Sequence, residues 1–116
     1  ARFQPAPEPL ATEHVVEKNV PDALINSGLE RWLRIRGIGS VAIVGVSTNH
    51  SVEATARTAG NLGFETIVVS DATDAFAKKN CDGLPRTAAE VHAMALSNLE
   101  GEYATIVTVA QLRKTL

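Results

Sequence analysis

The fold is decided by residues 40–73, which read SVAIVGVSTNHSVEATARTAGNLGFETIVVSDAT. The stretch begins and ends with short segments rich in Val and Ile, SVAIVG and ETIVVS, and this composition is typical of buried strands. Between them, Val52 to Leu62 carries apolar residues at helical spacing and ends just before Gly63. A buried strand, a helix and a second buried strand predict parallel strands joined by a right-handed crossover.

The same order of elements recurs on either side of this stretch. A helical run with Trp32 and Leu33 on one face precedes Gly37 and the strand SVAIVG, and a later helical run precedes Gly101 and the strand ATIVTV. Each glycine suits the left-handed position that follows the last turn of a helix. The repeated order of helix, glycine and strand predicts an α/β fold with a parallel sheet.

The last of these helices has its own start signal. Thr87 and Glu90 form a T-x-x-E capping box, which predicts a helix from Ala88 to Leu99. Its inward face, at helical spacing, is predicted to consist of Val91, Met94, Ala95 and Leu99.

The N-terminal part of the chain contains fewer signals. The segment His14–Lys18, HVVEK, is predicted to be one further short strand that ends in a lysine. Residues 1–12 carry three prolines between positions 5 and 9 and are predicted to form an extended arm. Since the chain opens on Ala1, directly in this irregular segment, we expect it to be part of a longer polypeptide.

The composition excludes several classes of protein. A chain of 116 residues, 45% hydrophobic and 21% charged, is typical of one globular domain or part of one. The formal net charge of −2 gives no basic surface for a nucleic-acid backbone. The longest apolar run, residues 41–46, is far shorter than the roughly 20 residues that cross a bilayer. We therefore expect a cytoplasmic protein that binds neither nucleic acid nor membranes.

The cysteine and two of the histidines give no sign of a further site. Cys81 is the only cysteine, so no internal disulfide can form, and its polar surroundings KKNCDGLPR predict a loop thiol rather than a reactive nucleophile. Neither His14 nor His92 has a partner at a spacing typical of metal ligands, and both are interpreted as structural or surface residues. No metal and no cofactor are predicted.

Ligands of open parallel sheets bind beyond the carboxyl ends of the strands. Two segments occupy such places, residues 45–51 and residues 70–73. The first leads through hydroxyl side chains into a helix N-terminus, where free N–H groups can stabilise an oxyanion. Spacing alone leaves two interpretations of Thr48, Asn49 and Ser51, either ordinary helix-capping residues or parts of an active site.

Residues 45–73 resemble the signature of isochorismatase-like hydrolases, which has the form G-V-x-T-N-x-C-V-x-x-T-A-R, then L-G-[YF], then V-V-x-D-A. The segments on both sides, VVEKNVPDALINSGLERWLRIRGI and RTAAEVHAMALSNLEGEYATIVT, also look similar to this family, so the resemblance covers nearly the whole chain. It implies a three-layer α/β/α fold with a parallel sheet.

The resemblance also implies roles for individual residues. Lys18 matches the family's catalytic lysine, and Ser51 stands where the nucleophilic cysteine is expected. The Val46–Ser47 bond matches a non-proline cis peptide that would direct the N–H of Ser47, with that of Ser51, into an oxyanion hole. The expected substrate contacts are Thr48 and Asn49.

Two departures from the family pattern qualify these roles. The catalytic aspartate at the end of the family's first strand has no counterpart, and of the strand order 3-2-1-4-5-6 only strands 3, 4, 5 and 6 are recognised. We therefore interpret residues 1–116 as a partial domain, expect its N-terminal portion as another chain or segment, and expect a homo-oligomer.

The second departure is Ser51, because a serine hydroxyl normally needs a strong base such as histidine. The adjacent His50 is expected to point away from Ser51.

Three functions remain open at this point. The first is a small-molecule hydrolase of an amide or ureido C–N bond, with Ser51 as nucleophile or as a hydroxyl that positions water. The second is a vinyl-ether hydrolase of the isochorismate type, which would use acid catalysis and no cysteine. The third is a catalytically silent binding or oligomeric subunit, an interpretation that Ser51 in place of cysteine favours.

Overall fold

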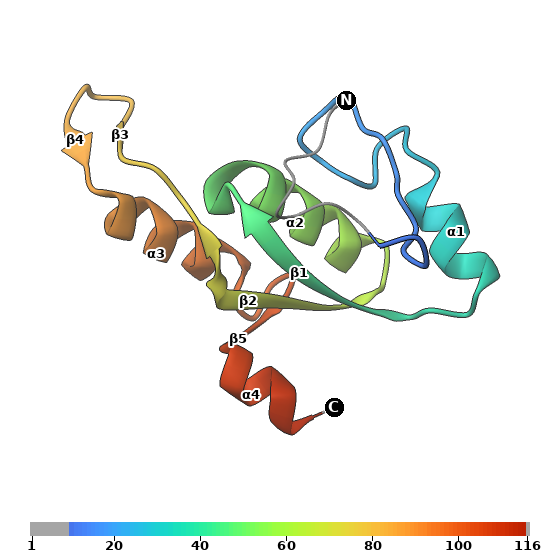
Figure 1. The fold of residues 1–116 in the computed structure, drawn as a ribbon. Coiled ribbons are helices and arrows are strands. Elements are labelled where there is room, and N and C mark those ends of the chain that lie inside the picture. The colour runs from blue at the N-terminus through green and yellow to red at the C-terminus, as the bar shows by residue number, and fades with distance from the viewer. Residues whose placement is uncertain (1–9, 116) are drawn as a thin grey trace.

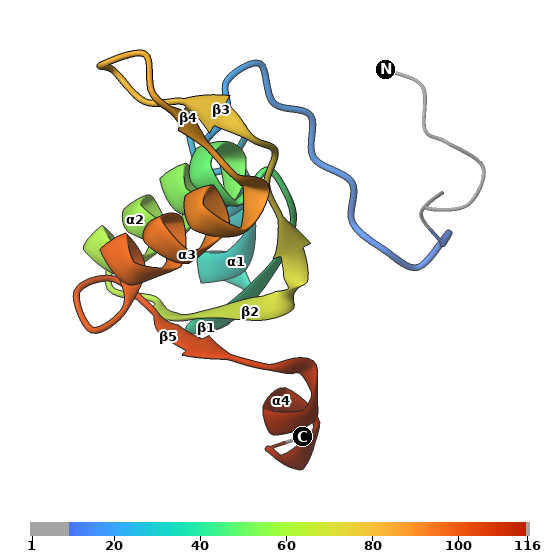
Figure 2. The same cartoon turned by 90° about the vertical axis from the view of Figure 1, so that its left-hand side faces the viewer.

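A three-stranded parallel sheet forms the centre of the computed structural model, which describes residues 10–115. Its strands are β1 (Ser40–Val46), β2 (Glu65–Asp74) and β5 (Thr105–Val107), in the order β1-β2-β5. Helices α2 (Glu53–Asn61) and α3 (Ala88–Leu99) lie on one side of the sheet, and α4 (Val109–Lys114) lies on the other (Figure 1, Figure 2). The predicted α/β fold with a parallel sheet is confirmed.

The glycines that end the helices adopt the predicted backbone conformation. Gly37 follows α1 (Leu29–Ile35), and Gly63 and Gly101 follow α2 and α3, with φ values of 69°, 89° and 80°. A side chain would be strained in this left-handed region, whereas glycine is not. The chain can therefore turn sharply from each helix towards the next strand.

The second strand is longer than predicted. Residues 70–73, which we expected to form a loop at the carboxyl end of the strand, continue β2 as far as Asp74. The pairing with β1 passes through an irregularity, because Ile43 pairs with Val68 whereas Gly45 pairs with Thr73. The extra residues in β2 form a bulge, and this long-range pairing overrides the local turn preference of the sequence SDAT.

The main core lies between the sheet and the pair of helices α2 and α3. Leu99, Ala56 and Val68 come from α3, α2 and β2 respectively, and all three are fully buried. A second cluster joins α1 to the end of α2, with Leu33, Ala59 and Phe64 at its centre. These two clusters fix α2 against the sheet along its whole length.

The face that α3 turns inward differs from the prediction. Ala95 and Leu99 are buried as expected, but Met94 is 64% exposed and Val91 is only partly buried. The inward stripe instead includes His92, so α3 is rotated relative to the predicted face. In an Ala-rich helix the apolar periodicity does not determine which face packs inward. Here the hydrogen bonds of His92 determine it.

The N-terminal segment does not form the predicted strand. Residues 14–18 have no sheet partner within residues 10–115, so the strand prediction is wrong for this chain. His14 instead stacks on Trp32, with ring centroids 4.3 Å apart, and Arg36 covers the same indole. The predicted arm lies mostly in residues 1–9, outside the described residues.

A small antiparallel hairpin precedes α3. Its strands are β3 (Lys78–Lys79) and β4 (Pro85–Arg86), and Cys81 is exposed in the turn between them, as expected of a loop thiol. No helix among residues 10–115 is long and apolar enough to cross a membrane.

Candidate active site

The loop between β1 and α2 is a tight turn built from small polar residues. It contains one π-helical turn, η1 (Thr48–Val52), which runs directly into α2. The peptide bond between Val46 and Ser47 is cis. The Ser51 hydroxyl donates a hydrogen bond to the Val46 carbonyl oxygen at 2.9 Å, and the Ser47 hydroxyl donates to Asn49 Oδ1 at 2.6 Å. The loop therefore places Ser47 and Ser51 together at the carboxyl end of β1.

Thr48 occupies a different environment from its neighbours in the loop. Its side chain is 0% exposed, and its Oγ1 lies 2.8 Å from Nδ1 of His92 on α3. The other ring nitrogen of His92, Nε2, lies 3.0 Å from the Ser70 carbonyl oxygen in β2. The hydroxyl of Thr48 is thus bound inside the protein, and the expected substrate contact of this residue stays a prediction. His92, interpreted from the sequence as structural or surface, is the residue that connects this loop to β2.

Lys18 lies in the segment that precedes α1. Its ammonium group is exposed and donates to the carbonyl oxygens of Val20 and Pro21, at 3.4 and 3.0 Å. Within residues 10–115 no hydrogen bond joins Lys18 to Ser51. The structure therefore places Ser47 and Ser51 in one loop, and the hydrogen bonds of Lys18 go to its own segment.

The segment that follows Lys18 is fastened to α2 by residues that sequence reasoning missed. Asp22 accepts a hydrogen bond from the Thr58 hydroxyl, and its second carboxylate oxygen accepts the N–H of Leu24 at 2.9 Å. The N–H of Ala23 donates to Thr55 Oγ1, also at 2.9 Å. The Pro-Asp pair signals a turn in the sequence, but nothing in it identifies Thr55 and Thr58 as partners.

Arg57, in the T-A-R part of the motif, connects α2 to its neighbours. Its guanidinium donates to Glu53 at 2.9 Å and lies over the ring of Tyr103, 4.6 Å from the centroid. The hydrogen bond to Glu53, followed by the interaction with Tyr103, raises the pKa of Arg57 above its ordinary value. Glu53 also accepts a hydrogen bond from Asn98 on α3 at 3.3 Å. These contacts hold α2 and α3 together on the C-terminal side of the loop.

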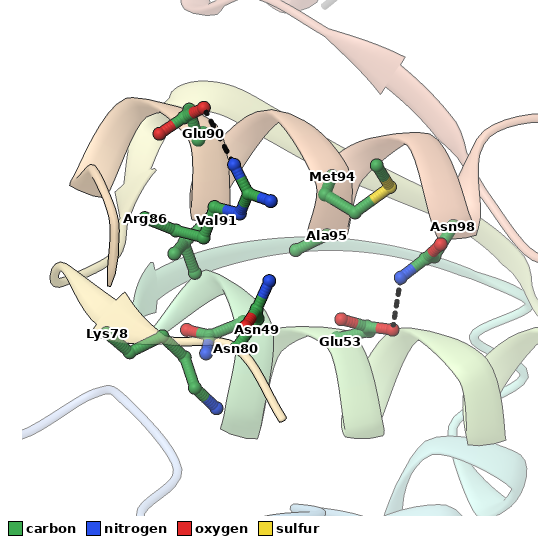
Figure 3. A pocket seen from close by; sticks show the side chains of 10 residues that line it. All are labelled: Asn49, Glu53, Lys78, Asn80, Arg86, Glu90, Val91, Met94, Ala95 and Asn98. Carbon is green, nitrogen blue, oxygen red and sulfur yellow. Dashed lines mark hydrogen bonds and ion pairs between the residues drawn. The ribbon is translucent and has the colours of Figure 1, made fainter. Parts of the chain in front are cut away.

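A cavity of about 550 Å³ opens between the start of α2, the β3–β4 hairpin and α3 (Figure 3). Val91, Met94 and Ala95 of α3 provide its apolar lining. Asn49 is the one candidate site residue that lines it, and neither Ser51 nor Lys18 does. The polar and charged residues around it are Asn49, Glu53, Lys78, Asn80, Arg86, Glu90 and Asn98.

The chemistry available at the β1–α2 loop is that of a hydroxyl beside a helix start. Ser51 is partly buried and precedes α2, so its oxygen lies near the positive end of the helix dipole. Among residues 10–115, no group of three or more His, Cys, Asp or Glu side chains could hold a metal ion. The arrangement is therefore compatible with attack by an oxygen nucleophile on a carbonyl carbon.

Comparison with known proteins identifies the family of this chain. The Isochorismatase domain family matches residues 1–111. The chain belongs to the isochorismatase family. The isochorismatase family protein YrdC of Bacillus subtilis strain 168 is 39% identical over 105 residues, which are 90% of this chain and 56% of YrdC.

A solved structure and a named enzyme also match most of this chain. An isochorismatase-family protein from Chromobacterium violaceum has a TM-score of 0.91 and 44% identity, over 95% of this chain and 57% of that one. Nicotinamidase 3 of Arabidopsis thaliana is 33% identical over 104 residues, which are 90% of this chain and 47% of the enzyme. The chain thus spans about half the length of the relatives that it matches.

Proposed function

We propose that this chain is part of an isochorismatase-family hydrolase that cleaves an amide or ureido C–N bond of a small molecule. Support comes from the names of its relatives, which include Nicotinamidase 3 and the ureidoacrylate amidohydrolase RutB of Variovorax paradoxus, 36% identical over 66 residues. The observation that carries the proposal is the position of the Ser51 hydroxyl, at the carboxyl end of β1 and at the start of α2.

In this proposal Ser51 is the nucleophile. Its Oγ attacks the carbonyl carbon, and the N–H groups of Ser47 and Ser51 stabilise the oxyanion. The C–N bond then breaks, the hydroxyl proton passes through a base to the leaving nitrogen, and water hydrolyses the acyl-enzyme. Lys18 provides positive charge near the site, and Asn49 contacts the substrate. A serine at this position makes the first step slow, because a hydroxyl ionises far less readily than a thiol.

Within residues 10–115 the Ser51 hydroxyl bonds to the Val46 carbonyl oxygen and to no carboxylate or imidazole that could act as its base. We propose that a further segment supplies it, as a carboxylate, together with strands that pair with the outer edge of β1. Within residues 10–115 no strand pairs with that edge, and the side chains of Ala42, Val44 and Val46 are exposed beside it. Backbone groups and apolar side chains at such an edge normally find a partner. A homo-oligomer is one form in which that partner can be present.

The test is to trap the acyl-enzyme. Nicotinamide and ureidoacrylate are the probes, each incubated with the protein and followed by intact mass and by product release. We expect a mass increase of one acyl group that Ser51→Ala abolishes and that the matched control Ser97→Ala, on the exposed face of α3, retains. Full turnover by Ser51→Ala would contradict the nucleophilic role of this serine.

A second candidate is a catalytically silent member of the family that serves as a binding or oligomeric subunit. The observation that favours it is the hydrogen bond of Ser51, whose proton is donated to the Val46 carbonyl oxygen rather than to a base. Ser51→Cys separates the two functions. Activity that appears only in this variant would support the silent subunit, because a thiolate needs less assistance than a hydroxyl.

A further inference from the structure

A histidine side chain joins the loop that carries Ser51 to β2 by hydrogen bonds. Thr48 follows β1, Ser70 lies in β2, and His92 lies on α3 between them. His92 Nδ1 lies 2.8 Å from Thr48 Oγ1, and His92 Nε2 lies 3.0 Å from the Ser70 carbonyl oxygen. Three elements that are distant in sequence therefore meet at one imidazole ring.

The chemistry of the partners fixes where the ring carries its proton. The Ser70 carbonyl oxygen can only accept a hydrogen bond, so Nε2 of His92 must be the donor. In the neutral ring Nδ1 then carries the lone pair and accepts the hydroxyl proton of Thr48. Within residues 10–115, Thr48 Oγ1 has no other hydrogen-bond partner, and its side chain is fully buried. The neutral Nε2–H tautomer therefore satisfies every polar group in this connection.

We propose that His92 is a positioning residue for the loop that carries Ser51, an inference that rests on the proposed active site. His92 reaches the loop through Thr48, which is the first residue of η1 and stands three positions before Ser51. The Ser47 hydroxyl bonds to Asn49 within the loop, and the Ser51 hydroxyl bonds to Val46, the last residue of β1, so neither bond joins the loop to α3 or β2. The Thr48 bond of His92 holds the start of η1 to α3, and the bond to the Ser70 carbonyl oxygen in β2 orients the imidazole ring. A nucleophile must be held within a fraction of an ångström of its productive position, so a hydrogen bond that fixes the loop can affect the reaction rate.

Two conservative variants separate the halves of the link. His92→Asn keeps an acceptor near the position of Nδ1 and so retains the contact with Thr48. His92→Gln keeps a donor near the position of Nε2 and so retains only the contact with Ser70. Thr48→Val removes the hydroxyl at nearly constant shape. A purely structural histidine would make the loss of function follow the loss of stability in all three variants.

The first measurement is the tautomer of His92 in long-range ¹H–¹⁵N spectra of the histidine rings. His14 and His50, both exposed, serve as internal references. We expect the Nε2–H form for His92, and an Nδ1–H form would overturn the proposal. This readout needs no substrate, so it stands even if no hydrolysis is found.

The second measurement is the reactivity of a thiol introduced by Ser51→Cys, in a Cys81→Ser background that removes the exposed native thiol. Iodoacetamide is the probe. We expect His92→Gln and Thr48→Val to lower the alkylation rate about tenfold, the effect of one pKa unit on the thiolate population, and His92→Asn to lower it less than about twofold. Equal losses in the Asn and Gln variants, or no loss in either, would overturn the proposal. A failed hydrolase assay with these rates intact would reject the proposed function alone.

Discussion

Val68 and Val44 are valines of neighbouring parallel strands, yet Val68 is fully buried and Val44 is 59% exposed. Val68 lies on the face of the sheet that α2 and α3 cover, which we call the packed side. Val44 lies at the outer strand β1, which pairs with no other strand within residues 10–115 and which we call the open side. A cavity of about 220 Å³ lies on the packed side, between β1, α1 and α2, and is lined by Leu33, Val41 and Ala59.

The two sides divide the candidate site between them. The packed side holds the loop from Ser47 to Ser51, through Thr48 and His92. The open side is where we propose that a further segment pairs with β1 and supplies the base. The difference indicates that contacts within the described residues specify the position of Ser51, the residue that we propose as nucleophile. The predictions below test the packed side first and end on the open side.

The largest expected effect is the loss of a core side chain on the packed side. Leu99 of α3 is fully buried between α2 and the sheet. We expect Leu99→Ala to lower the free energy of unfolding by about 2–5 kcal/mol, because a cavity remains where the side chain was. The measurement is urea denaturation followed by circular dichroism. The control is Met94→Ala on the same helix, which is exposed and should change stability by less than about 0.5 kcal/mol.

A smaller loss of stability is expected from a substitution where α2 contacts the turn after α3. A Cβ atom at Gly60 would lie 2.6 Å from the carbonyl oxygen of Tyr103 and 3.0 Å from its Cα, both backbone atoms. We expect Gly60→Ala to cost about 1–3 kcal/mol in denaturation experiments, because one of the two backbones must shift. Gly39→Ala is the matched control, since a Cβ there meets no atom within 4 Å. Equal stability of the two variants would show that α2 does not approach the turn this closely.

The start of α3 should contribute less than its core. The Thr87 hydroxyl accepts the N–H of Glu90, and the Glu90 carboxylate accepts the N–H of Thr87, so the predicted capping box is present. We expect Thr87→Ala to lower the free energy of unfolding by about 1 kcal/mol. Thr87→Ser keeps the hydroxyl and should restore most of the loss.

The same box predicts a pH dependence. Hydrogen bonds from the backbone and side chain of Thr87 lower the pKa of Glu90 below its ordinary value of 4.5. A carboxyl whose pKa is lower in the folded protein stabilises the fold above that ordinary value and loses the contribution as the pH falls through its folded pKa. Glu90→Gln should therefore be less stable than the parent at pH 7, and the difference in free energy of unfolding should shrink as the pH falls below 4.5. Urea denaturation of both proteins at pH 7 and below pH 4.5 measures this difference. A difference that grows on acidification would contradict this sign.

The packed side was largely predictable from the sequence, for a physical reason. Helix ends at Gly37, Gly63 and Gly101 and the cap at Thr87 are local signals, and each is read from a few neighbouring residues. The signature also indicated where Ser51 would lie. The rotation of α3 was missed because Met94 and His92 compete for the inward face, and only the distant partners Thr48 and Ser70 decide between them.

The open side was less predictable, since its structure depends on contacts that a sequence pattern does not reveal. The apolar alternation in HVVEK is typical of a strand, but a strand requires a neighbour, and residues 14–18 have none within residues 10–115. The anchor of this segment is Asp22, whose partner Thr58 is 36 residues away. Lys18 shows the same limit, because the resemblance assigns it a role that its contacts with Val20 and Pro21 do not reveal.

The smallest expected effect separates the two sides directly. Val44→Thr on the open side should change the free energy of unfolding by less than about 0.5 kcal/mol, because the added hydroxyl stays in water. Val68→Thr, the matched change on the packed side, should cost about 1–3 kcal/mol, because its hydroxyl is buried among apolar side chains. Urea denaturation of both variants measures the contrast. If Val44→Thr is as costly as Val68→Thr, the open side is already covered in solution, and size-exclusion chromatography with light scattering would then show a second copy of the chain on it. If the contrast holds, β1 remains available for the segment that we propose to supply the base.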